Sequence, residues 1–207
     1  QDWQVKWIAA PPREGGESAL PMLQRRFQLR QDVRQARLRV SALGLYDLWL
    51  NGQRVGNSCL TPGWVDYHQH LPYQTYDVTA MLQVGGNAIG AYLAPGWYAG
   101  FLGWGNRRHL YGSQLALLCQ LELTYEDGHR ETLGSDGTWK STVGPVTAAE
   151  LYHGEAYDAR NEHPAWATRD CDDRQWPTVM VLPSPAAPLV SHQLALPRRH
   201  EELPAKA

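Results

Sequence analysis

The sequence of 207 residues is poor in several features that would otherwise define its class. Its three cysteines, Cys59, Cys119 and Cys171, are too scattered for a CxxC metal site or a disulfide framework. The formal net charge is only -2, so no charge excess points to nucleic acid or to an acidic membrane surface as a partner. No apolar run is long enough to cross a bilayer, and the first residues lack the basic and then apolar pattern of a signal peptide.

Phenylalanine is rare as well, with two Phe against nine Trp and ten Tyr. Most aromatic rings therefore carry an N–H or O–H group, which suits half-exposed surfaces and binding sites. The length is typical of one domain with an extension at each end. Because position 1 is Gln and not Met, we expect the chain to be a processed or excised piece of a longer polypeptide.

Long helical patterns are also missing, and alternating patterns take their place. Residues 36–50 alternate apolar and polar side chains, as in a half-buried strand. Asn51-Gly52 follows directly and is a strong hairpin signal, since both residues tolerate the positive φ of a type I′ turn. A second alternating run turns at Asp127-Gly128. The pattern predicts antiparallel strands joined by tight turns.

These signals together predict an all-β fold, an antiparallel β-sandwich of jelly-roll type. The one helical start is a single turn that Asp77 or Thr79 can cap. We expect lead-in strands in residues 1–30, the sandwich module in 31–182 and a proline-rich connector in 183–207, outside the core.

The stretch GWYAGFLGWGN, residues 96–106, combines four aromatic rings with four glycines. So much glycine predicts a loop and neither a strand nor a helix. A pyranose has an apolar C–H face and a rim of hydroxyls, so a sugar site needs a flat aromatic ring beside fixed polar groups. Trp97, Tyr98 and Trp104 could supply the rings, with Gly96 allowing close approach of the backbone. The alternative is that Trp97 and Tyr98 are buried at one open end of the sandwich.

Two further positions have competing interpretations. The amide of Asn51 could contact a sugar or offer its oxygen to Ca²⁺, but the hairpin turn explains this residue by itself and is favoured. In PGWVDY, Trp64 is a further candidate for sugar contact. Asp66 is best explained by hydrogen bonds to nearby backbone N–H groups, with calcium ligation as the alternative.

The segment GEAYDAR holds Glu155, Asp158 and Arg160 within six residues. In an extended segment Glu155 and Asp158 point to opposite faces, whereas Asp158 and Arg160 share one. Arg160 would then favour the ionised form of Asp158, which disfavours a role as general acid. We favour an ion pair or a cation site, with both carboxylates as candidate ligands, over direct catalysis.

The ordered motifs in LGLYDLWLNGQRVG, PGWVDY, DVT, GWY, GEAYDAR and DDRQW resemble the N-terminal β-sandwich module of bacterial α-L-rhamnosidases, glycoside hydrolase family 78. The resemblance covers roughly residues 3 to 182 and implies that the sandwich is galactose-binding-domain-like. It implies a parent protein that hydrolyses terminal α-L-rhamnose with inversion in a separate (α/α)6 barrel, whose acid-rich motif is absent from this chain. It also implies that a similar module binds L-rhamnose with a calcium ion in part of the family.

The leading hypothesis is a non-catalytic carbohydrate-binding module that recognises rhamnose or rhamnose-containing glycans, with Ca²⁺ as the one cofactor implied. Its expected partners are the glycan and the catalytic domain of the same parent chain, and neither nucleic acid nor a membrane. One alternative is a structural module that supports the catalytic barrel and binds no sugar by itself. The other is a stand-alone lectin-like protein.

Overall fold

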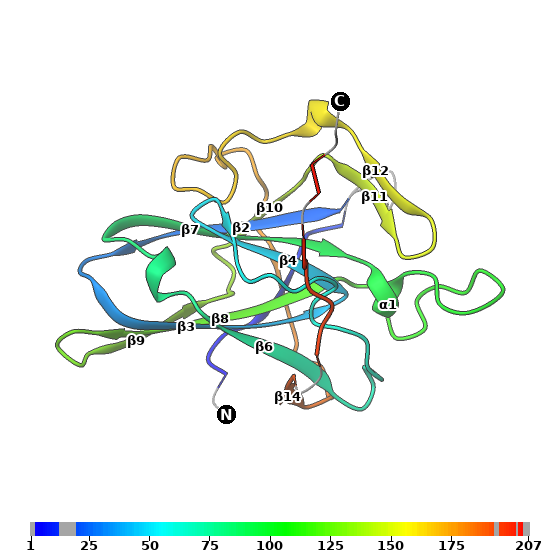
Figure 1. Cartoon of the computed structure of the whole chain (residues 1–207), viewed down its shortest axis with the longest axis horizontal. Coiled ribbons are helices and arrows are strands. Elements are labelled where there is room, and N and C mark those ends of the chain that lie inside the picture. The colour runs from blue at the N-terminus through cyan, green and yellow to red at the C-terminus, as the bar shows by residue number, and fades with distance from the viewer. Residues whose placement is uncertain (1–2, 13–19, 193–194, 202, 205–207) are drawn as a thin grey trace.

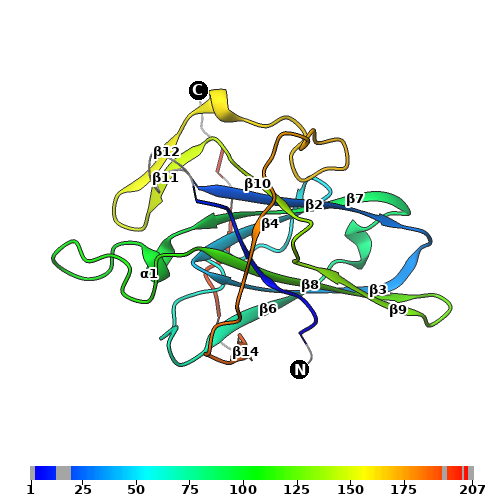
Figure 2. The same cartoon turned by 180° about the vertical axis from the view of Figure 1, so that it is seen from behind.

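The computed structural model describes residues 3–12, 20–192, 195–201 and 203–204 (Figure 1). Two sheets pack face to face, and a small third sheet lies at one end (Figures 1 and 2). The first main sheet has seven strands, in the order β13-β1-β8-β3-β6-β14, with β9 also paired to β8. Its strands are β1 (Trp7–Ala9), β3 (Val33–Leu43), β6 (Leu71–Asp77), β8 (Ala116–Tyr125), β9 (Arg130–Gly134), β13 (Met180–Leu182) and β14 (Leu189–Ser191).

The second main sheet has five strands in the order β10-β2-β7-β4-β5, and β11 and β12 form the small third sheet. Three short helical turns complete the described part of the chain. The strands are β2 (Pro21–Leu29), β4 (Leu45–Leu50), β5 (Gln53–Arg54), β7 (Gly85–Ala94), β10 (Lys140–Val143), β11 (Val146–Glu150) and β12 (Gly154–Tyr157). The helical turns are η1 (Thr79–Met81), α1 (Gly96–Ala99) and η2 (Ala159–Asn161).

The core lies between the two main sheets and is built by the alternation read from the sequence. Leu48 and Leu50 of β4 are buried against Leu121 and Leu123 of β8 and their neighbours. Each such side chain contributes about 1.5–3 kcal/mol by leaving water. The predicted all-β sandwich is thus confirmed, and among the strand pairs of the described residues only β6-β14 runs parallel.

The predicted turns are found where the sequence placed them. Asn51 and Gly52 have φ values of 51° and 78°, and they join β4 to β5 with Leu50 opposite Gln53. The β8-β9 hairpin likewise turns at Gly128, with φ of 84°. The helical turn η1 follows Asp77, whose Oδ1 accepts a 3.0 Å hydrogen bond from the backbone N–H of Thr79.

The expectation of a loop throughout residues 96–106 was wrong for the first four residues. They form the single helical turn α1, which begins after Pro95 at φ of -57°. Proline favours this φ, and its carbonyl accepts the hydrogen bond from the N–H of Ala99. The loop conformation begins after this turn, so glycine did not prevent a helix that proline starts.

The proline-rich segment 183–207 was expected to be a connector, and its described part differs from that expectation. Leu189 of β14 lies opposite Leu71 of β6, and it packs on the buried cluster at this end of the sandwich. Further along, the carbonyl of Pro197 accepts a 2.8 Å hydrogen bond from the N–H of Cys59. Proline spacing predicts breaks in regular structure but not whether the pieces pair with a sheet.

Within the described ranges, no helix has the length and apolar character needed to span a membrane.

Candidate functional site

Two indole rings lie together at the end of the sandwich that carries α1. The rings of Trp64 and Trp97 are nearly parallel, with an interplanar angle of 11° and centroids 6.2 Å apart. Trp64 is 54% exposed, whereas Trp97 is half-buried against the core. The structure therefore presents a solvent-facing aromatic pair formed from two separate segments.

Local backbone geometry places these two rings. Trp64 follows Gly63, whose φ is 99°, and the carbonyl of Gly63 accepts a 3.0 Å hydrogen bond from the Tyr67 hydroxyl. Trp97 follows Gly96, whose φ is 50°. A Cβ at Gly96 would lie 2.4 Å from Cγ of Leu45, so only glycine lets α1 rest directly on β4.

The other two aromatic candidates lie in different surroundings. Tyr98 is buried, and its ring meets that of Tyr67 edge to face at 5.3 Å. Burial raises the pKa of Tyr98, as expected of a phenol in the interior. Trp104 is 94% exposed on the loop between α1 and β8. The stacked pair thus consists of Trp64 and Trp97, with Tyr98 inside the fold and Trp104 in solvent.

The polar candidates Asn51 and Asp66 make hydrogen bonds within the fold. The Asn51 amide nitrogen donates to the carbonyl of Met81 at 2.9 Å and to Oδ1 of Asn87 at 2.8 Å. The Asn51 amide oxygen accepts from the N–H of Ala88 at 2.9 Å. Asp66 accepts a 3.0 Å hydrogen bond from the N–H of His68 through Oδ1. Both side chains thus make hydrogen bonds within the fold, and Asp66 accepts from a backbone N–H as the sequence suggested.

The acidic candidates near η2 separate into a paired and an unpaired carboxylate. Asp158 accepts hydrogen bonds of 2.8 Å and 2.6 Å from Nε and Nη2 of Arg160, which lower the pKa of Asp158. The predicted ion pair is present, although a helical turn and not an extended segment brings the two side chains together. Glu155 lies exposed on β12. Across the part of the chain that the structure describes, no three His, Cys, Asp or Glu side chains form a group that could hold a metal ion.

A groove that the sequence did not predict lies between the five-stranded sheet and the β11-β12 hairpin. The hairpin lies above this sheet, on the side of the molecule that carries α1 (Figure 1). Its volume is about 670 Å³. The lining brings together segments far apart in the sequence, which is why periodicity alone could not find the groove. Its lining includes Asp47, Trp49, Arg54, Tyr92, Tyr157 and Trp166.

Trp166 forms part of the groove wall because its indole lies directly on the sheet. A Cβ at Gly90 would lie 2.5 Å from Cζ3 of Trp166, so the ring occupies the space above a glycine. The ring centroid lies 4.8 Å from that of Tyr92 and 6.1 Å from that of Trp49. The two neighbours of Trp166 in the chain, Ala165 and Ala167, have φ values of 58° and 55°. Such a left-handed conformation is strained for alanine.

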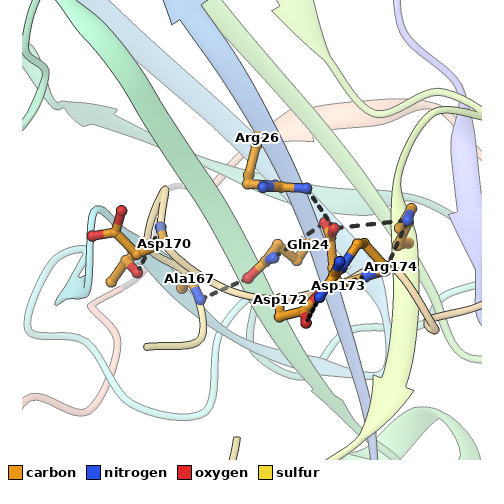
Figure 3. Close-up of polar contacts among 9 residues, drawn as sticks. Gln24, Arg26, Ala167, Asp170, Asp172, Asp173 and Arg174 are labelled. Atoms are coloured by element: carbon orange, nitrogen blue, oxygen red, sulfur yellow. Dashed lines mark hydrogen bonds and ion pairs between the residues drawn. The ribbon is translucent and has the colours of Figure 1, made fainter. Parts of the chain in front are cut away.

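A buried polar cluster anchors the loop that carries Trp166 (Figure 3). Asp173 is only 5% exposed and accepts a 2.6 Å hydrogen bond from Nη2 of Arg26 on β2. Gln24, also on β2, accepts a 2.7 Å hydrogen bond from the N–H of Ala167 through Oε1. Both ends of the loop segment are thereby attached to the same strand, which explains the sequence DDRQW structurally.

The fold is that of a two-layer β-sandwich domain with aromatic side chains at its surface. Residues 31–201 match the family model described as the alpha-L-rhamnosidase N-terminal domain, and the chain belongs to this family.

Proteins similar to this chain bear the same description. The α-L-rhamnosidase of Streptomyces avermitilis is 44% identical over 191 residues, which cover 91% of this chain and 18% of that protein. The crystal structure of native α-L-rhamnosidase from Aspergillus terreus matches with a TM-score of 0.86 and 37% identity, over 91% of this chain and 22% of that one. The Streptomyces avermitilis enzyme complexed with L-rhamnose matches with a TM-score of 0.78 and 46% identity, over 83% of this chain and 16% of that one. The chain thus spans about a fifth of the length of these relatives.

Proposed function

We propose that this chain is a non-catalytic carbohydrate-binding module of an α-L-rhamnosidase and that it binds L-rhamnose or a rhamnose-containing glycan through Trp64 and Trp97. The observation that carries the proposal is the parallel, solvent-facing pair of indole rings at one end of the sandwich. The proposal is also consistent with the family to which the chain belongs.

The chemistry of a 6-deoxy sugar suits such a pair. One face of the ring and the methyl group offer C–H groups that pack on an indole, while the hydroxyls remain available for hydrogen bonds. Trp97 is held by its position in α1, and Trp64 by the turn at Gly63. Because the rings are already ordered, binding costs little conformational entropy.

A calcium ion remains part of the proposal as an additional partner. Asp66, Glu155 and Asp158 are candidate ligands individually, since the described residues contain no group of three such side chains. Carboxylate oxygens are the ligands that Ca²⁺ prefers. Asp158 is already engaged by Arg160. A calcium ion bound to Asp158 would therefore have to compete with the guanidinium of Arg160.

Isothermal titration calorimetry with L-rhamnose tests the proposal. We expect binding by the unmodified chain and at least about a tenfold loss of affinity in Trp64→Ala and in Trp97→Ala, equivalent to about 1.4 kcal/mol each. Tyr152→Ala is the matched control, since Tyr152 is an aromatic residue 62% exposed at the β11-β12 turn. Trp104→Ala shows whether the third indole adds to the affinity. Each titration is repeated with excess calcium chloride and with excess EDTA.

The second candidate function is a structural module that supports the catalytic barrel of the parent protein. It is favoured by the hydrogen bonds of Asn51 and Asp66 within the fold and by the burial of Tyr98. If the unmodified chain shows no heat with L-rhamnose, with or without calcium, the binding proposal is wrong and this second function stands.

A further inference from the structure

The geometry points to a second carbohydrate-binding site, in the groove between the five-stranded sheet and the β11-β12 hairpin. This site would take an uncharged pyranose unit. It goes beyond the proposed function because it shares neither Trp64 nor Trp97 with the site proposed above.

The size and walls of the groove suit a sugar. Its volume of about 670 Å³ lies within the range of about 300–1,000 Å³ that is typical of small-molecule sites. One wall is the outer face of β4 and β7, with Trp49 and Tyr92. The opposite wall is the β11-β12 hairpin, with Tyr157, which is 57% exposed. An aromatic side chain therefore lies on each side of the space.

The backbone around Trp166 is strained in a way that a merely packed loop does not require. Ala165 and Ala167 both have a positive φ, a conformation that is unfavourable for a residue with a Cβ. The hydrogen bond from Ala167 to Gln24 and the glycine at position 90 hold the indole against this strain. Strain of this kind concentrates at binding sites, where it fixes a side chain in one position.

The groove also contains a donor without an acceptor. The indole Nε1 of Trp49 is buried and has no hydrogen-bond partner among the described residues. A buried donor left without an acceptor destabilises the fold, because it has lost its hydrogen bonds to water. Trp49 lines the groove, so a sugar hydroxyl bound there would accept this hydrogen bond once the indole turns Nε1 toward the groove.

The charges of the groove favour a neutral ligand. Arg54 donates a 2.7 Å hydrogen bond from Nε to Oδ1 of Asp47, so these two charges compensate each other. The Asp47 side chain is 40% exposed, so its carboxylate can also accept a hydrogen bond from a sugar hydroxyl. Glu155 is exposed at the groove and has no ion-pair partner in the described ranges. A uronate would meet this negative charge, whereas an uncharged pyranose would not.

NMR of the indole N–H groups tests this site directly. The resonance of Trp49 is assigned by its disappearance in Trp49→Phe, which keeps an aromatic ring and removes the donor. The unmodified chain is titrated with methyl α-L-rhamnoside, D-galactose and sodium D-galacturonate. We expect the Trp49 resonance to shift with one or both neutral sugars, and about tenfold more weakly or not at all with the uronate.

Three variants separate this site from the indole pair. Trp64→Ala should leave the shift of the Trp49 resonance and its midpoint unchanged. Tyr157→Ala removes a largely exposed ring and should weaken the sugar response of the Trp49 resonance at least about fivefold. Trp49→Phe should remove the groove contribution from the calorimetric titration and retain that of Trp64 and Trp97.

Two results would overturn the inference. The first is a Trp49 resonance that none of the sugars moves at saturating concentration. The second is a shift that disappears in Trp64→Ala, because one site would then explain all of the binding. Neither result contradicts the proposed function, which fails only if the calorimetric response of the Trp64 and Trp97 pair is absent.

Discussion

The carboxylate of Asp173 and the guanidinium of Arg26 lie 2.6 Å apart, although 147 positions separate them in the sequence. The carboxylate is almost completely buried, and Nζ of Lys140 lies 3.7 Å from Oδ1, the same oxygen that Arg26 contacts. Asp173 thus joins the loop of Trp166 to β2 and β10. The ion pair of Asp172 with Arg174, next to it in the chain, lies at the surface.

Asp173→Ala should lower the free energy of unfolding by about 1–3 kcal/mol, because it removes the charge-assisted hydrogen bond from Arg26, whose side chain is itself 44% exposed. The matched control is Asp172→Ala, which removes an exposed ion pair and should leave the free energy of unfolding nearly unchanged. Urea unfolding followed by tryptophan fluorescence measures both. Equal effects of the two substitutions would contradict the structural role of Asp173.

Asn51→Ala should lower the free energy of unfolding by about 2–3 kcal/mol without changing sugar affinity. The substitution removes three hydrogen bonds and places alanine at a φ of 51°. Asn57→Ala, at an exposed position, serves as the control. Chemical unfolding and calorimetry with L-rhamnose separate the two effects. A variant with intact stability and lost affinity would show that Asn51 contacts the ligand.

Gly90→Ala should displace Trp166 and destabilise the fold by about 1–3 kcal/mol, because the new Cβ would overlap the indole. Gly137→Ala is the control, since its Cβ would meet its nearest neighbour, in Val181, at an ordinary distance of 3.5 Å. The near-ultraviolet circular dichroism of the tryptophans should change in the first variant and persist in the second. An unchanged spectrum in Gly90→Ala would place Trp166 elsewhere.

Stability should fall as the pH rises above about 9, in part because of Cys119. Burial raises the pKa of this thiol from its ordinary value of 9.0 to about 12. Between these two values the unfolded chain loses a proton that the folded chain keeps, so the contribution is complete below pH 9 and decreases up to pH 12. Urea midpoints measured across this range should decline less steeply in Cys119→Ala. An identical decline in both proteins would show that Cys119 has no part in it.

Local signals in the sequence were sufficient for much of the fold. The alternation around Leu48 and Leu50 predicted the buried face of β4, since a strand exposes every second residue. Asn51-Gly52 predicted the hairpin because few other residue pairs tolerate two positive φ values. The helical turn α1 was missed because the effect of Pro95 on the backbone competes with that of the glycines after it.

The candidate site was less predictable because it depends on contacts between distant segments. Trp97 and Trp64 were each singled out, but no local pattern indicates that their rings lie parallel. The groove was missed for the same reason. Trp49 lies on the outward face of β4. Trp166 is 117 positions further along the sequence, and only folding brings the two rings together.

The pairing of β14 with β6 also covers a strand edge through which two copies of the chain could associate. Without Leu189–Ser191, the first residues of β6 would present unpaired N–H and C=O groups at the margin of the seven-stranded sheet. Such a margin is a template for association with another copy. A version cut after Leu182 should therefore form soluble oligomers or precipitate as its concentration rises, which light scattering would detect. The short strand β14, which follows a run of prolines, therefore helps to keep the domain from aggregating.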